Sequence, residues 1–160
     1  MTKTPINFTL NGSDTGVFVE AGDNLLNVLR RGVGDLSPKF GCGQGTCGTC
    51  TVLIDGEPHL SCLTLAETVQ GRTVETTNGL ANGPDLHPLQ TEFMEGFAAQ
   101  CGYCTPGMLM AAKALLSRVP NPSREEVVEA ISGNICRCTG YDPIVDAILA
   151  GAAKMQGRVA

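Results

Sequence analysis

The sequence of 160 residues contains no tryptophan, only two histidines and two tyrosines, and no run of basic residues. Eleven Lys and Arg stand against sixteen Asp and Glu, which gives a formal net charge of −5. A chain without clustered cations has little with which to hold a phosphate backbone, so we expect no nucleic-acid partner. No apolar stretch approaches the roughly 20 residues of a membrane helix. The first residues lack the apolar centre of a signal peptide, so we expect a cytoplasmic protein with no membrane span.

Groups that carry out chemistry on a substrate are also scarce. The sequence has no Ser/His/Asp set and no paired-carboxylate motif, and its glycines form no G-x-G-x-x-G between a strand and a helix. We therefore expect no catalytic residue and no dinucleotide site on this chain. His59 and His87 are interpreted as surface or turn residues rather than as metal ligands.

Cysteine, in contrast, is abundant. In a secreted chain, eight cysteines would predict four disulfides with 105 possible pairings. In an intracellular chain thiols stay reduced, and clustered thiols usually bind metal. Because no export signal is present, metal binding is favoured for the eight positions, which are Cys42, Cys47, Cys50, Cys62, Cys101, Cys104, Cys136 and Cys138.

The first half of the chain has the pattern of a small α+β unit. Short alternating or apolar segments predict strands, and Asn11-Gly12 and Asp55-Gly56 are dipeptides typical of hairpin turns. A helix with apolar residues 25, 26, 28 and 29 is expected, with Asp23 as its cap and its end at Gly32 or Gly34. The expected strands cover 6–10, 17–19, 51–54, 57–60 and 69–75.

The second half is predicted to be helical. A turn-rich segment, 77–85, is the expected linker. Helices are predicted over 88–99, with an apolar stripe of Leu89, Phe93, Met94 and Phe97, and over the apolar run 108–116. A third follows the capping-box pair Ser123 and Glu126, and a fourth begins at Asp142-Pro143. Four short helices favour a small bundle. Each half has only about 80 residues, so its core is small enough to need stabilisation by bound metal.

The first four cysteines have the spacing C-x4-C-x2-C…C, in the segment GCGQGTCGTC followed by Cys62. This is the ligand pattern of plant-type [2Fe–2S] proteins, in which a loop winds round the cluster and supplies three of four thiolates. Interspersed glycines permit such winding and leave backbone N–H groups free to donate to sulfur. The first set lacks the two short C-x2–4-C pairs that structural zinc usually takes.

The last four cysteines form two short pairs, Cys101-x2-Cys104 and Cys136-x-Cys138, each just before a predicted helix. Loops at neighbouring helix ends can meet and present four sulfurs to one site. Spacing alone leaves both zinc and a [2Fe–2S] cluster open for this second set. A thioredoxin-type redox pair is disfavoured, because it would need a preceding strand and would leave Cys136 and Cys138 unexplained.

Three motifs together carry a resemblance that covers nearly the whole chain: GCGQGTCGTC with Cys62, QCGYCTPG from Gln100, and GNICRCTGY from Gly133. In this order they resemble the small iron–sulfur subunit of the xanthine oxidase family of molybdenum hydroxylases, of the carbon monoxide dehydrogenase and isoquinoline oxidoreductase type. The resemblance favours iron–sulfur over zinc in the second set. Thr46 and Thr49 depart from it, since many relatives carry Glu and Ala there.

The resemblance implies a fold, cofactors and partners. It implies a β-grasp ferredoxin-like domain over 1–78 and a four-helix-bundle domain over 79–160, with one [2Fe–2S] cluster in each set of four cysteines. It further implies a large molybdopterin-binding subunit, which Gln100 contacts, and a medium FAD-binding subunit, in a hetero-oligomer such as a dimer of heterotrimers. Arg137 and Tyr141 lie within the third motif, where partner contact and helix packing both stay open.

The sequence therefore predicts a subunit that passes electrons from molybdenum through two clusters toward FAD. The first alternative is a free-standing two-cluster ferredoxin that shuttles electrons between separate enzymes. The second is a zinc-binding interaction module without redox activity.

Overall fold

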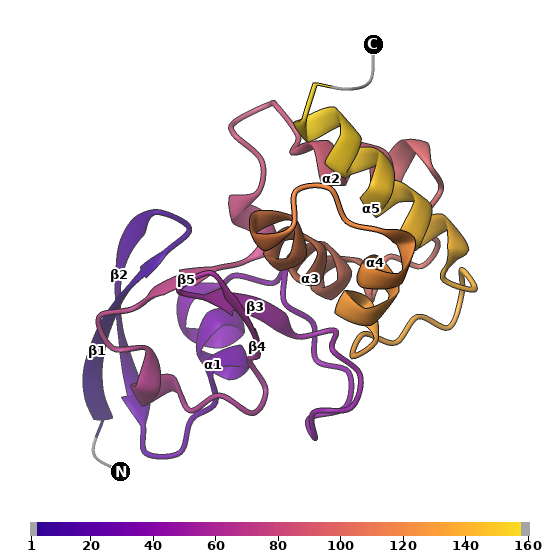
Figure 1. Cartoon of the computed structure of the whole chain (residues 1–160). Helices are drawn as coiled ribbons and strands as arrows, with labels where there is room; N and C mark the ends of the chain where they lie inside the picture. The colour runs from indigo at the N-terminus through magenta and orange to yellow at the C-terminus, as the bar shows by residue number, and fades with distance from the viewer. Residues whose placement is uncertain (1–2, 158–160) are drawn as a thin grey trace.

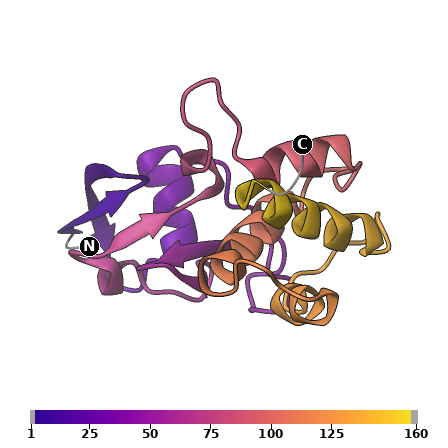
Figure 2. The same cartoon turned by 45° about the horizontal axis from the view of Figure 1, so that its top comes forward.

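A computed structural model describes residues 3–157 of the chain, and it has a sheet half and a helical half that lie side by side (Figures 1 and 2). The expected α+β class is confirmed. Among the described residues, no helix is long and apolar enough to cross a membrane.

The sheet has five strands in the order β2-β1-β5-β3-β4. Two antiparallel hairpins make its edges, and β5 joins them by pairing parallel to β1 and antiparallel to β3. Asn11 and Asp55 have positive φ, as the predicted Asn-Gly and Asp-Gly turns require. The strands are β1 (Lys3–Leu10), β2 (Ser13–Glu20), β3 (Thr51–Ile54), β4 (Glu57–Leu60) and β5 (Thr73–Glu75).

One helical segment packs against this sheet, consisting of α1 (Leu25–Asn27) continued by the π-helical turn η1 (Val28–Val33). It ends at Gly34, one of the two expected positions. The expected cap was wrong: Asn24 accepts the hydrogen bond from the N–H of Asn27, whereas Asp23 accepts from the N–H of Glu20. The carboxylate of Asp23 closes the turn that precedes the helix instead.

The last expected strand, 69–75, is also shorter than predicted. Residues Ala66–Val69 form the 3-10 helix η2, so only 73–75 remain extended. The predicted linker contains a further 3-10 turn, η3 (Thr77–Gly79), and then a series of turns before the second half begins.

Four helices make the second half: α2 (Pro88–Glu95), α3 (Thr105–Arg118), α4 (Arg124–Ile131) and α5 (Asp142–Met155). The capping box of Ser123 and Glu126 is confirmed, as is the start of α5 at Asp142-Pro143. The predicted helix 88–99 was too long, because the chain turns at Gly96 and Phe97 takes a φ of 53°. Its apolar stripe is accordingly only half buried: Leu89 and Phe93 are buried, whereas Met94 and Phe97 are exposed.

Strand β3 connects the two apolar cores. Val52 and Ile54 pack into the core between the sheet and α1, and Leu53, on the opposite face, packs into the core of the helices. Because side chains alternate along a strand, one short strand serves both halves.

Candidate metal centres

The first thiol loop, residues 41–50, runs without regular structure into β3 and carries three of the four cysteines of the first set. The β3–β4 hairpin returns the chain so that Cys62 lies near Cys50. The Ser61 hydroxyl fixes this return by donating to the carbonyl oxygen of Cys50 at 2.7 Å. Cys50 and Cys62 are buried with Leu26, and Cys42 and Cys47 are half-buried. The predicted first set is therefore brought together.

Hydrogen bonds and burial act on the first-set thiols in opposite directions. The pKa of Cys42 is lowered to about 5, chiefly by hydrogen bonds from Thr46 and the backbone of Gln44. The N–H of Thr46 lies 3.3 Å from Cys42 Sγ. Burial, with the neighbouring Cys50 thiol, raises the pKa of Cys62 to about 11. A cation or cluster that neutralises the thiolates would remove the cost of charging such buried groups.

The second set meets at the N-terminal ends of two helices. Cys101 and Cys104 precede α3, and Cys136 and Cys138 precede α5. All four line one cavity of about 240 Å³. Burial, together with the neighbouring Cys136 and Cys101, raises the pKa of Cys104 to about 12. The expectation that these two loops converge is confirmed.

Cys136 is buried, and its thiol receives several hydrogen bonds from its own loop. Burial would raise the pKa of its thiol, but hydrogen bonds from the Thr139 hydroxyl and from the N–H groups of Cys138 and Thr139 lower it. The Thr139 hydroxyl donates to Cys136 Sγ at 3.2 Å and accepts from the N–H of Tyr141. The loop therefore holds this sulfur in an environment that favours the thiolate.

Both loops of the second set are hydrogen-bonded to the first thiol loop. The N–H of Ile135 donates to the carbonyl oxygen of Cys47 at 2.9 Å, and the Thr49 hydroxyl donates to that of Tyr103 at 2.7 Å. The amide of Asn134 donates to Gly48 O at 2.9 Å. Sequence reasoning missed Asn134 and assigned Thr49 no role, although its departure from the pattern of relatives had marked that position.

The residues predicted beside the second set lie on the protein surface. Gln100 is exposed, and within residues 3–157 its side chain forms no hydrogen bond. Arg137 and Tyr141 are exposed too, and the Tyr141 hydroxyl accepts a hydrogen bond from the N–H of Cys136. His87 caps α2, where its Nδ1 accepts from the N–H of Leu89. Sequence reasoning did not assign His87 this capping role.

Each set offers the four thiols that a [2Fe–2S] cluster needs as ligands. Two thiols of the first set are buried, and hydrogen bonds reach the sulfur of Cys42 in the first set and of Cys136 in the second. Such a cluster takes four thiolates spread over two irons. Within residues 3–157, no three His, Cys, Asp or Glu side chains are arranged to hold a metal ion on their own.

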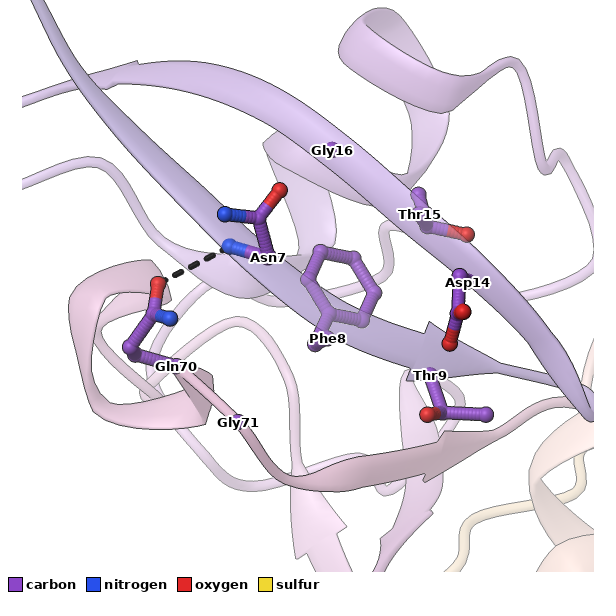
Figure 3. Close-up of a pocket in the computed structure, with 8 residues that line it drawn as sticks. All are labelled: Asn7, Phe8, Thr9, Asp14, Thr15, Gly16, Gln70 and Gly71. Carbon is purple, nitrogen blue, oxygen red and sulfur yellow. Dashed lines mark hydrogen bonds between the residues drawn. The ribbon is translucent and has the colours of Figure 1, made fainter.

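A separate hollow of about 410 Å³ lies on the β1–β2 hairpin beside Gln70 and Gly71 (Figure 3). The side-chain oxygen of Gln70 accepts from the N–H of Asn7 at its rim. Asp14 is the one ionisable residue among those lining it, and none of them is a cysteine. This hollow is therefore distinct from both thiol sets.

Two family descriptions match the chain in succession. Residues 8–78 match the "2Fe-2S iron-sulfur cluster binding domain", and residues 76–149 match the "[2Fe-2S] binding domain". The protein therefore has two [2Fe–2S]-binding domains, one for each half of the chain.

Relatives resemble the chain over nearly its full length. It is 45% identical to the nicotinate dehydrogenase small FeS subunit of Eubacterium barkeri, over 92% of this chain and 94% of that protein. A chain of quinoline 2-oxidoreductase from Pseudomonas putida 86 superposes with a TM-score of 0.94 at 48% identity, covering 99% of this chain and 100% of that one. In the aldehyde oxidoreductase of Megalodesulfovibrio gigas the 41% identical region is only 17% of that protein.

Proposed function

Because the chain belongs to the small iron–sulfur subunits of the xanthine oxidase family of molybdenum hydroxylases, we propose that it carries electrons from a molybdenum centre through two [2Fe–2S] clusters toward FAD. The observation that carries this proposal is the pair of converging thiol sets, joined by direct hydrogen bonds between their loops. Each cluster, when bound, takes up and releases one electron.

The eight cysteines divide between the two sites. In this proposal Cys42, Cys47, Cys50 and Cys62 hold the first cluster in a β-grasp ferredoxin-like domain over residues 1–78. Cys101, Cys104, Cys136 and Cys138 hold the second cluster in a four-helix-bundle domain over residues 79–160. The hydrogen bond between Ile135 N–H and the carbonyl of Cys47 keeps a backbone contact between the two ligand loops.

The partners follow from what this chain lacks and from what lies on its surface. Gln100 is exposed beside Cys101, which supports a contact with the molybdopterin cofactor of a large subunit. FAD would reside on a medium subunit, in a hetero-oligomer such as a dimer of heterotrimers. We place the complex in the cytoplasm, in keeping with eight cysteines that form no disulfide.

The test is metal analysis and EPR of the protein purified from its native host. We expect about four irons per chain, from two [2Fe–2S] clusters, and two distinct signals after reduction. Molybdenum and FAD should purify with it. A stable monomer free of both would favour the two-cluster ferredoxin, and one zinc with a single signal would favour zinc in the second set.

Two ligand variants, each the control for the other, test the division of the cysteines. Cys62→Ser should abolish the EPR signal of the first cluster and leave that of the second cluster unchanged. Cys136→Ser should abolish the signal of the second cluster and leave that of the first unchanged. Both should lower stability as well, because metal-binding free energy is folding free energy in domains this small. Loss of the same signal in both variants would contradict the division into two sets.

A further inference from the structure

In the loop that precedes α5, a short chain of hydrogen bonds ends on the sulfur of Cys136. The Thr139 hydroxyl donates to Cys136 Sγ at 3.2 Å, and the same oxygen accepts from the N–H of Tyr141 at 3.2 Å. A hydroxyl has one proton to donate. With its oxygen engaged by the Tyr141 amide, the proton of Thr139 is directed to the sulfur.

Tyr141 holds Thr139 in this position at a cost in backbone strain. Its φ is 73°, a region that non-glycine residues occupy only where their surroundings compel it. The backbone N–H and the phenol of Tyr141 are both used inside the loop, since the N–H donates to Thr139 and the phenol oxygen accepts from the N–H of Cys136 at 3.0 Å. The Thr139 hydroxyl thus supplies a side-chain hydrogen bond to this sulfur, beside the backbone N–H groups of Cys138 and Thr139.

From this geometry we infer that Thr139 is a positioning residue that raises the reduction potential of the second cluster through its hydrogen bond to Cys136 Sγ. The inference rests on the proposed function, in which Cys136 is a cluster ligand. On reduction one electron enters, one ferric iron becomes ferrous, and the hydroxyl proton stays on Thr139. The added negative charge is shared by the ligand sulfurs, so a donor stabilises the reduced form more than the oxidised form.

The test is a redox titration of the purified complex, with the two EPR signals followed separately. Thr139→Val keeps the branched shape but lacks the hydroxyl, and we expect the midpoint of the second cluster to move to lower potential. Thr139→Ser keeps the donor and should titrate like the wild type. The midpoint of the first cluster, measured in the same samples, is the internal reference and should not move.

Three results would overturn the inference: a Thr139→Val midpoint equal to the wild type, a Thr139→Ser midpoint displaced as far as that of valine, or equal displacement of both clusters. If the valine variant does not assemble, Thr139→Ala takes its place. Proton ENDOR of the reduced second cluster should then show an exchangeable coupling in the wild type that the alanine variant lacks, and identical couplings would refute the hydrogen bond.

The same titration separates this inference from the proposed function. If the wild-type complex lacks the EPR signal of a second [2Fe–2S] cluster, both the assignment of Cys136 as a cluster ligand and the role of Thr139 are refuted. If the second cluster gives a normal signal and its midpoint potential does not change when the Thr139 hydroxyl is removed, only the role of Thr139 is refuted.

Discussion

At the scale of single residues, Gly107 in α3 packs closely against the first thiol loop and Asn134. A β-carbon at this position would lie 2.4 Å from the carbonyl oxygen of Gly48 and 2.9 Å from Nδ2 of Asn134. Both neighbours already form the hydrogen bond that joins the loops. Glycine is therefore required here by backbone contact, although the position is helical.

We expect Gly107→Ala to destabilise the protein by about 1–3 kcal/mol, the usual cost of overpacking. Helix propensity acts in the other direction and favours alanine by about 1 kcal/mol. Gly133→Ala is the matched control, because a β-carbon there would have no atom within 4 Å. Thermal unfolding of the two variants gives the comparison, and equal stability would show that the loops can move apart without cost.

The division of the cysteines between the two sites could be predicted from the sequence, whereas the contacts between their loops could not. Cysteine spacing alone divided the eight thiols into two sets, because ligands of one cluster must lie close in the chain or at the ends of adjacent elements. The contacts of Thr49 and Asn134 were not predictable, since each joins segments far apart in the sequence. Such contacts depend on how the two halves dock, and single-sequence patterns carry no information on docking.

At the scale of elements, local signals located the hairpin turns and two of the helix starts, but they misplaced the cap of α1 and the end of α2. The hairpin dipeptides and the Ser123–Glu126 capping box act within four residues, so sequence alone located them. The end of α2 was missed because Phe97, an apolar residue in helical register, takes a positive φ and lies 82% exposed. The choice of Asn24 over Asp23 as a cap depended on the turn before the helix.

The cap of α2 makes the stability of this helix depend on pH. His87 accepts the N–H of Leu89 only when its imidazole is neutral, and burial, with Lys113 nearby, holds its pKa below the usual 6.5. The unfolded chain therefore takes up the proton first as pH falls. The stabilisation is complete above about pH 6.5 and declines as pH falls toward the lowered pKa of the folded state.

Between about pH 7.5 and about pH 5.5, roughly one unit either side of the usual histidine pKa of 6.5, we expect the melting temperature of the wild type to fall more than that of His87→Asn. Asparagine is a good N-cap that does not titrate in this range. Subtracting the two pH profiles removes contributions from the cysteines and clusters, which both proteins share. Parallel profiles would show that folding leaves the pKa of His87 unchanged, contrary to this account.

At the scale of the whole molecule, ion pairs between the sheet and α3 help to hold the halves together. Lys113 pairs with Glu75 of β5, and both side chains are largely shielded, at 25% and 30% exposure. Arg118, one turn further along α3, pairs with Glu57 of β4 in an exposed position, at 58% and 60%. The same helix thus offers a shielded pair and an exposed pair for comparison.

A double-mutant cycle with Glu75→Gln and Lys113→Met should give a coupling of about 1 kcal/mol, at the upper end for pairs open to solvent. The cycle with Glu57→Gln and Arg118→Met should give about 0.3 kcal/mol or less, because exposed charges are screened. Chemical denaturation of the cluster-loaded protein measures both. Equal couplings would mean that shielding at the junction adds nothing to the attraction.

The hydrogen bond between Gly48 and Asn134 spans 86 residues of sequence. A ribosome therefore releases the first thiol loop well before the residue that closes over it has been synthesised. In that interval the first thiol loop lacks the hydrogen bond that Asn134 later donates to it, because domains fold in the order in which they are synthesised. The contact that closes the first thiol loop therefore forms only late in the synthesis of the chain.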